Sequence, residues 1–62
     1  MIYRVRCGAH ITIYEGEVIS VCADSIDEAK EMAEEGFREI MDEKYAWADI
    51  GEVHFEEIVE VD

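Results

Sequence analysis

One alternating pattern constrains the fold of this chain more than any other feature of its sequence. From Tyr3 to Ile13 the odd-numbered residues are Tyr, Val, Cys, Ala, Ile and Ile, whereas the even-numbered ones are Arg, Arg, Gly, His and Thr. Successive side chains of a strand point to opposite faces, so this phase predicts one long strand with one buried face. Gly8 keeps the phase but removes a side chain, which predicts a bend or a local weakness there.

A second alternating segment runs from Glu17 to Ala23. Between the two segments, residues 14–16 (Tyr-Glu-Gly) predict a three-residue hairpin loop with Gly16 in the left-handed conformation. The expected register pairs Ile11 with Ile19 and Ala9 with Val21. This register puts both apolar sets on one face, whereas a two-residue loop would put them on opposite faces. Burial therefore favours the three-residue loop.

The segment 25–45 predicts a single amphipathic helix. Ser25 and Glu28 have the spacing of a capping box, in which Glu28 reaches back to the amide of Ser25. Behind this cap, one stripe at helical spacing carries Ile26, Ala29, Ala33, Phe37, Ile40, Met41 and Lys44. Gly36 lowers helix stability by up to about 1 kcal/mol relative to Ala, and it allows close approach to the sheet.

The C-terminal segment, Glu52 to Val61, alternates again, with Val53, Phe55, Val59 and Val61 in phase. Glu57 falls on this apolar face, which predicts either a bulge near residues 56–57 or a place at the sheet margin. A right-handed crossover through the helix puts this strand beside the first. We therefore expect one α+β domain over residues 1–62, with β-β-α-β order. Its three-stranded antiparallel sheet has strand order 2-1-3, and the helix packs on one face.

The charge of the chain is large and unevenly distributed. Its 62 residues include 17 acids and 5 bases, which gives a net charge of −12. Residues 24–62 hold fifteen of the acids and three of the bases, so they account for the whole net charge. Such a chain lacks the cations that nucleic acids and anionic membranes require, but it is steered toward basic protein surfaces.

The helix places most of these acids on the side opposite its apolar stripe. They are Asp27, Glu28, Glu31, Glu34, Glu35, Glu39, Asp42 and Glu43, and the chain continues with Asp49, Glu52, Glu56, Glu57, Glu60 and Asp62. An acidic helix face is often only a solvated surface, but regularly spaced carboxylates can also imitate a phosphate backbone. Two aromatic residues after the helix could anchor a protein contact or, for Trp47, close the end of the core. The expected partner-binding residues are Glu28, Glu31, Glu34, Glu35, Glu39, Asp42, Glu43, Asp49, Glu52, Tyr45 and Trp47.

The open face of the sheet carries Arg4 and Arg6 in the first strand. Both are expected to form cross-strand pairs with glutamates of the last strand.

Neither a metal site nor a catalytic site is expected. Cys7, His10, Cys22 and His54 could be zinc ligands, but they form only one Cys-x-x-His pair. Cys7 and Cys22 fall on opposite faces, which disfavours a disulfide. A Cys22–His10 nucleophile pair is geometrically allowed but lacks a group to orient the base and an oxyanion hole. We therefore expect no catalytic residues, metal or cofactor.

No N-terminal apolar run suits a signal peptide or a membrane span, so a cytoplasmic protein with reduced thiols is expected.

The run Val18–Ala29 resembles the strand-into-helix junction of the small DpnD/PcfM-like proteins of phages and mobile elements. There an apolar strand ends in Ala-x-Ser-x-x-Glu-Ala, which opens the single helix, and a short acidic strand follows. This resemblance implies the same strand-strand-helix-strand order and carries over no catalytic residue. In size and charge the chain is also similar to phage-encoded anti-CRISPR and anti-restriction proteins that mimic DNA.

Together these features predict a non-catalytic inhibitor in the bacterial cytoplasm. It would block a nucleic-acid-processing defence complex by occupying the basic site of a protein partner, such as a CRISPR–Cas effector subunit. The alternative is a small interaction module that binds through a sheet edge or through its exposed aromatic residues. A monomer is expected, although a free edge strand also allows a dimer.

Overall fold

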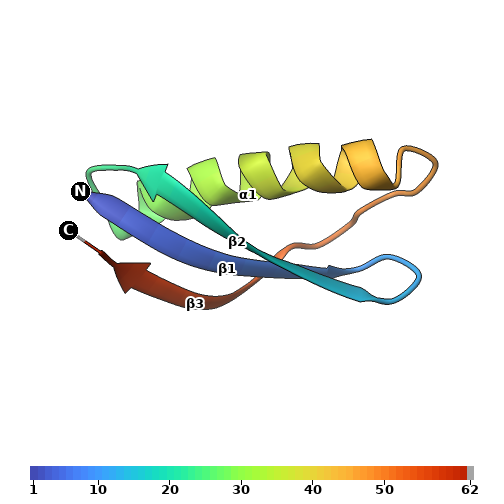
Figure 1. The fold of residues 1–62 in the computed structure, drawn as a ribbon, viewed down its shortest axis with the longest axis horizontal. Helices are drawn as coiled ribbons and strands as arrows, with labels where there is room; N and C mark the ends of the chain where they lie inside the picture. Colours follow the sequence, from blue (N-terminus) through green and yellow to red (C-terminus); the bar gives the residue numbers. More distant parts are fainter. Residues whose placement is uncertain (62) are drawn as a thin grey trace.

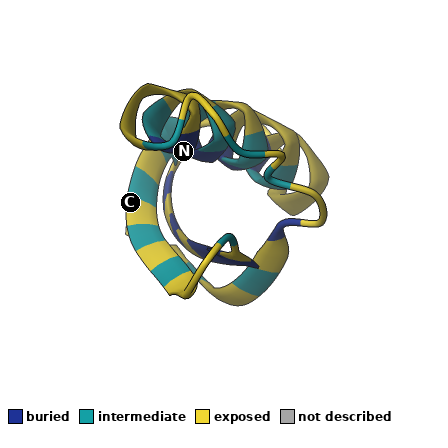
Figure 2. Ribbon diagram, turned by 90° about the vertical axis from the view of Figure 1, so that its right-hand side faces the viewer, coloured by how far each residue is buried: buried dark blue, intermediate teal, exposed yellow. Residues whose placement is uncertain are grey.

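A computed structural model of the protein describes residues 1–61 and has the expected β-β-α-β order (Figure 1). Its elements are β1 (Ile2–His10), β2 (Tyr14–Cys22), α1 (Ile26–Lys44) and β3 (His54–Glu60). The sheet has the order β2-β1-β3, and both neighbouring pairs are antiparallel. α1 covers one face of this sheet, which curls around the helix (Figure 2). The predicted α+β fold and strand order are therefore confirmed.

The hairpin loop lies three residues earlier than predicted. His10 pairs with Tyr14, so residues 11–13 form the loop, and the Ile11 amide donates to the Ile13 carbonyl at 3.0 Å. The true register puts Val5 opposite Ile19, and Gly16 lies within β2 without a positive φ. The predicted register was wrong because periodicity specifies only which face a residue occupies. The register moved by an even number of residues, so the odd-numbered side chains still face α1.

Gly8 lies beneath the end of the Tyr14 side chain. Tyr14 at the start of β2 extends across Gly8 in β1, and its hydroxyl donates to the Glu56 carboxylate on β3. A Cβ atom on Gly8 would collide with the Tyr14 ring. His10 packs its ring against Tyr14 with 4.8 Å between the centroids. One side chain thus connects all three strands on the open face, which is the face turned away from α1.

A β-bulge resets the phase of β3, as one of the two alternatives predicted. Arg6 lies opposite Glu57 and Cys7 lies opposite Phe55, so Glu56 is the additional residue in β3. After the bulge, Ile58 takes the core-facing position opposite Val5. Val59 was expected on the apolar face, but it lies opposite Arg4 on the open face.

Val61 follows Val59 onto the open face, which also differs from the prediction. Its amide donates to the Ile2 carbonyl at 2.8 Å, and its side chain is exposed. The alternation of this segment is interrupted only once, at the bulge, so all later residues change face.

The capping of α1 differs from the prediction in one bond. Ser25 Oγ accepts from the Glu28 amide at 3.2 Å, as predicted. The Glu28 carboxylate accepts from the Asp24 amide at 3.0 Å, whereas the amide of Ser25 was expected. Both bonds satisfy amides at a helix start that otherwise lack partners.

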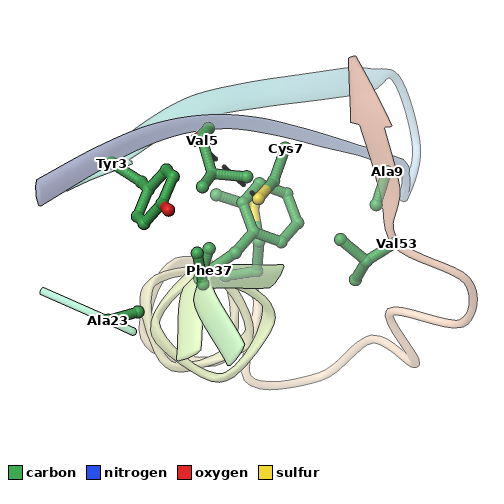
Figure 3. Packing of buried hydrophobic residues seen from close by; sticks show 10 residues of the cluster. Tyr3, Val5, Cys7, Ala9, Ala23, Phe37 and Val53 are labelled. Atoms are coloured by element: carbon green, nitrogen blue, oxygen red, sulfur yellow. Dashed lines mark hydrogen bonds between the residues drawn. The ribbon is translucent and has the colours of Figure 1, made fainter. Parts of the chain in front are cut away.

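The core lies between the buried face of β1 and the stripe of α1 (Figure 3). Small residues, Ala29 and Ala33, let the backbones approach, while Phe37 and Met41 fill the remaining space and are fully buried. Ile26 belongs to the predicted stripe, but 51% of it is exposed. Among residues 1–61, the buried apolar residues are Tyr3, Val5, Cys7, Ala9, Ala23, Ala29, Ala33, Phe37, Met41 and Val53.

We predict that Gly8→Ala lowers the free energy of unfolding by about 0.5–1.5 kcal/mol, because the new methyl group displaces the Tyr14 hydroxyl from its hydrogen bond with Glu56. The matched control is Gly16→Ala in β2, where the added Cβ atom would lie 3.5 Å from the Cys7 carbonyl oxygen, an ordinary contact. Urea denaturation of both variants measures the difference. In a Tyr14→Ala background the cost of Gly8→Ala should fall. Equal stability of the two glycine variants would contradict this account.

Candidate functional site

The acids of α1 form one continuous exposed face. Its members Glu28, Glu31, Glu35, Glu39, Asp42 and Glu43 are exposed, and Glu34 is half-buried. Steps of three or four residues put neighbouring carboxylates about 5–6 Å apart along the helix axis. Among residues 1–61, this face contains one ion pair, between Glu34 and Arg38 at 3.0 Å. The predicted acidic face of the helix is thus exposed and little neutralised.

Arg38 attaches the loop after α1 to this acidic face. Its Nε donates to Glu34, and its Nη2 donates to the Gly51 carbonyl at 2.6 Å. Gly51 has φ +68°, the left-handed conformation that glycine adopts readily and that turns the chain back along the helix. The sequence shows the Glu34–Arg38 spacing of four residues, but the contact with the loop depends on the tertiary structure.

The attached loop brings Asp49 to the helix acids. A shallow hollow of about 410 Å³ is lined by Glu35, Arg38, Glu39, Asp42, Ala48, Asp49 and Ile50. Four predicted site residues therefore meet around one arginine. Of the other predicted acids, Glu34 pairs with Arg38 at the edge of the hollow. Glu28, Glu31 and Glu43 lie elsewhere on α1, and Glu52 is exposed in the loop.

Two of the three acids of β3 do not extend this surface, and the third, Glu60, lies opposite Tyr3 at the far end of the strand. Glu56 and Glu57 lie on the open face of the sheet, where Glu56 contacts Tyr14 and Glu57 lies opposite Arg6. Asp62 lies outside the described residues. The acidic surface predicted for most of the C-terminal two thirds is therefore divided between two faces of the molecule.

The two aromatic residues after α1 differ in exposure. Trp47 is 73% exposed, whereas Tyr45 is half-buried against the core and its amide donates to the Met41 carbonyl. Their rings meet edge to face, with centroids 6.0 Å apart. Trp47 thus does not close the end of the core. It stands in solvent beside the hollow, because Ala48 and Asp49 follow it directly in the chain.

The cysteines and histidines do not form a common site. Cys22 pairs with Ile2 at one end of β1 and His10 lies at the other end, about 26 Å away at roughly 3.3 Å per residue. The Cys22–His10 pair that the sequence allowed is therefore excluded by distance. Cys7 is buried, and its burial raises the pKa of its thiol to about 11. Within residues 1–61, no three His, Cys, Asp or Glu side chains are grouped so that they could hold a metal ion.

The cross-strand ion pairs predicted for the two arginines of β1 do not form. Arg6 lies opposite Glu57, but Arg4 lies opposite Val59 because of the bulge. Neither arginine takes part in an ion pair with any other residue of the range 1–61. Together with Val18, these residues line a hollow of about 200 Å³ on the open face.

We predict that Arg38→Gln releases the loop at residues 46–52 from α1, because it removes the cationic donor to the Gly51 carbonyl. Amide hydrogen exchange and ¹⁵N relaxation should show faster motion at residues 48–51, while β1 and β2 keep their protection. Lys30→Gln is the control, since it makes the same charge change on the same helix without a hydrogen bond to the loop. An unchanged loop in Arg38→Gln would contradict this role.

In the described residues, no helix is both long enough and apolar enough to cross a membrane. No family model, curated protein or solved structure matches this chain. The resemblance to DpnD/PcfM-like proteins therefore stays a prediction.

Proposed function

We propose that this protein is a non-catalytic acidic inhibitor that occupies the nucleic-acid-binding site of a bacterial defence complex, of the CRISPR–Cas or restriction type. It would act in the cytoplasm of a bacterial host, where its carboxylates would occupy the positions at which the complex binds the phosphates of a nucleic acid. One observation carries the proposal. The acids of α1 form a continuous, exposed and little neutralised row, which the attached loop extends with Asp49.

The charge density of this row supports mimicry of a nucleic acid strand. Eight acids lie between Asp27 and Glu43, a length of about 24 Å at 1.5 Å per residue. That is about one carboxylate per 3 Å, close to the roughly 3.4 Å per phosphate along one strand of duplex DNA. A groove lined with Lys and Arg could therefore meet a similar number of negative charges.

The physical consequences of such binding are specific. Attraction between a −12 chain and a basic groove is long-ranged, and it weakens as salt screens the charges. The like-charged carboxylates repel one another by a few tenths of a kcal/mol per pair, and a basic partner would relieve this cost. No hydrogen bonding to bases is needed, because the inhibitor replaces the backbone of the nucleic acid.

We predict that Glu31→Gln, Glu35→Gln and Glu39→Gln together weaken binding to basic nucleic-acid-binding complexes, without unfolding the protein. The immobilised chain would be exposed to bacterial lysates that contain defence complexes and washed in rising salt. Bound proteins would be eluted with duplex DNA and identified by mass spectrometry. The matched control is Glu17→Gln, Glu57→Gln and Glu60→Gln, which removes the same charge from the strands.

Mimicry would be supported if DNA elutes nucleic-acid-binding effectors from the wild type and from the control, but not from the variant with the three substitutions in α1. If the α1 variant is well folded and retains the same proteins at the same salt concentration, the acids of α1 are not the binding surface. The proposal would then be wrong.

The exposure of Trp47 favours a second candidate, an interaction module that binds through aromatic residues. Trp47 is 73% exposed and its ring meets that of the partly buried Tyr45. Trp and Tyr are enriched among the residues that contribute most to binding at protein interfaces. Such a contact depends mainly on apolar burial, so moderate salt should not dissociate it.

For this candidate we predict that Trp47→Ala abolishes retention of a partner that survives washing at high salt. Met32→Ala is the control, because Met32 is also an exposed apolar residue (41%) and lies on α1 away from the loop. This candidate would be excluded if the partner is lost from the variant with three substitutions in α1 but is still retained by Trp47→Ala.

A further inference from the structure

The open face of the sheet is unlike the acidic helix face. Its positions are arranged in rows across β1 and β3, with Ile2 beside Val61, Arg4 beside Val59, and Arg6 beside Glu57. Ile2, Val59 and Val61 are 42%, 45% and 47% exposed. No element of the described chain covers them, since α1 lies on the other side of the sheet (Figure 2).

The charges of the open face cancel within it. Arg4 and Arg6 are balanced by Glu56 and Glu57, whereas the sequence has three bases and fifteen acids besides these four residues. Both arginines lack an ion-pair partner among residues 1–61. This neutral face is therefore where two copies of a −12 chain can approach with the least like-charge repulsion.

We propose that the open face is a self-complementary interface at which two copies of this chain form a two-fold dimer. A two-fold axis lying between β1 and β3, parallel to the strands, brings each row of β1 opposite the same row of β3 in the second copy. Arg6 then faces Glu57, Arg4 faces Val59, and Ile2 faces Val61, with each contact made twice. Arginine is enriched in interfaces of this kind, where its long side chain also packs against apolar groups.

The shape of the sheet limits the strength of this dimer. A standard interface buries about 800 Å² on each partner, whereas the curl of the sheet makes the open face convex (Figure 2). Contact is then centred on β1 and β3, and we expect a weak, reversible dimer. Both acidic helices stay on the outer sides of the dimer, so the proposal does not depend on what the helices bind.

Sedimentation equilibrium of the wild-type chain is the first test, from about 10 µM to about 1 mM in low and high NaCl. We expect a reversible monomer–dimer equilibrium whose dissociation constant falls as salt rises, because salt screens the repulsion between the two −12 chains. Binding of a basic partner would respond to salt in the opposite way. A chain that stays monomeric throughout this range would overturn the proposal, whatever the variants do.

A charge exchange identifies the interface. Arg6→Glu and Glu57→Arg each place like charges opposite one another, so each variant alone should dimerise at least about tenfold more weakly than wild type. When the two variants are mixed, the glutamate introduced at position 6 of one copy faces the arginine introduced at position 57 of the other. The second contact of the pair is the native one, between Glu57 and Arg6. The mixture should therefore form a heterodimer with an affinity close to that of wild type.

The mixed pair has the same net charge as the wild-type pair, so net charge cannot explain a difference in affinity between them. The variants carry −14 and −10, so their heterodimer carries −24, as do two wild-type chains. Circular dichroism and urea denaturation verify that both variants fold. A dimer that both variants keep unchanged would lie elsewhere, for example at the β2 edge, and would overturn the proposal. Two folded variants that dimerise weakly alone and fail to pair when mixed would also overturn it.

Discussion

The fold depends on the burial of one face of β1 beneath the stripe of α1. β1 is the central strand, and its core-facing residues pack in one cluster with Ala29, Ala33, Phe37 and Met41 of α1. Full burial of a large apolar side chain contributes about 1.5–3 kcal/mol. No polar or charged residue of the described chain is buried. The chain therefore avoids the cost of desolvating a charge, and a small core offsets the repulsion among its acids.

The same arrangement gives the molecule two faces with different physical properties. α1 covers one face of the sheet and directs its acids outward, whereas the uncovered face combines aliphatic side chains with equal numbers of opposite charges. Binding of the proposed basic partner at the first face would be promoted by attraction and weakened by salt. The proposed dimer contact at the second face would depend on apolar burial and be opposed by net charge, so salt would strengthen it. The two proposed contacts would therefore respond to salt in opposite directions.

Two tertiary contacts, one on each side of the molecule, shape these two faces. Arg38 holds the loop after α1 against the helix and so adds Asp49 to the acidic row. On the other side of the molecule, Tyr14 extends across Gly8 and joins all three strands through Glu56. Its hydrogen bond to Glu56 raises the pKa of the Tyr14 hydroxyl. Each contact depends on a glycine, since Gly51 turns the loop and Gly8 leaves space for the phenol ring.

The sequence alone determined the order of elements, the strand order, the helix cap at Ser25 and the acidic outer face of α1, because these follow from periodicity and local hydrogen bonding. It did not determine the hairpin register, since alternation fixes the face of a residue but not its partner. It predicted a bulge among alternatives, but not which valines the bulge would expose. The exposure of Trp47 and the gathering of Asp49 with the helix acids also required the tertiary structure. Both depend on contacts between residues far apart in the chain, which no local pattern specifies.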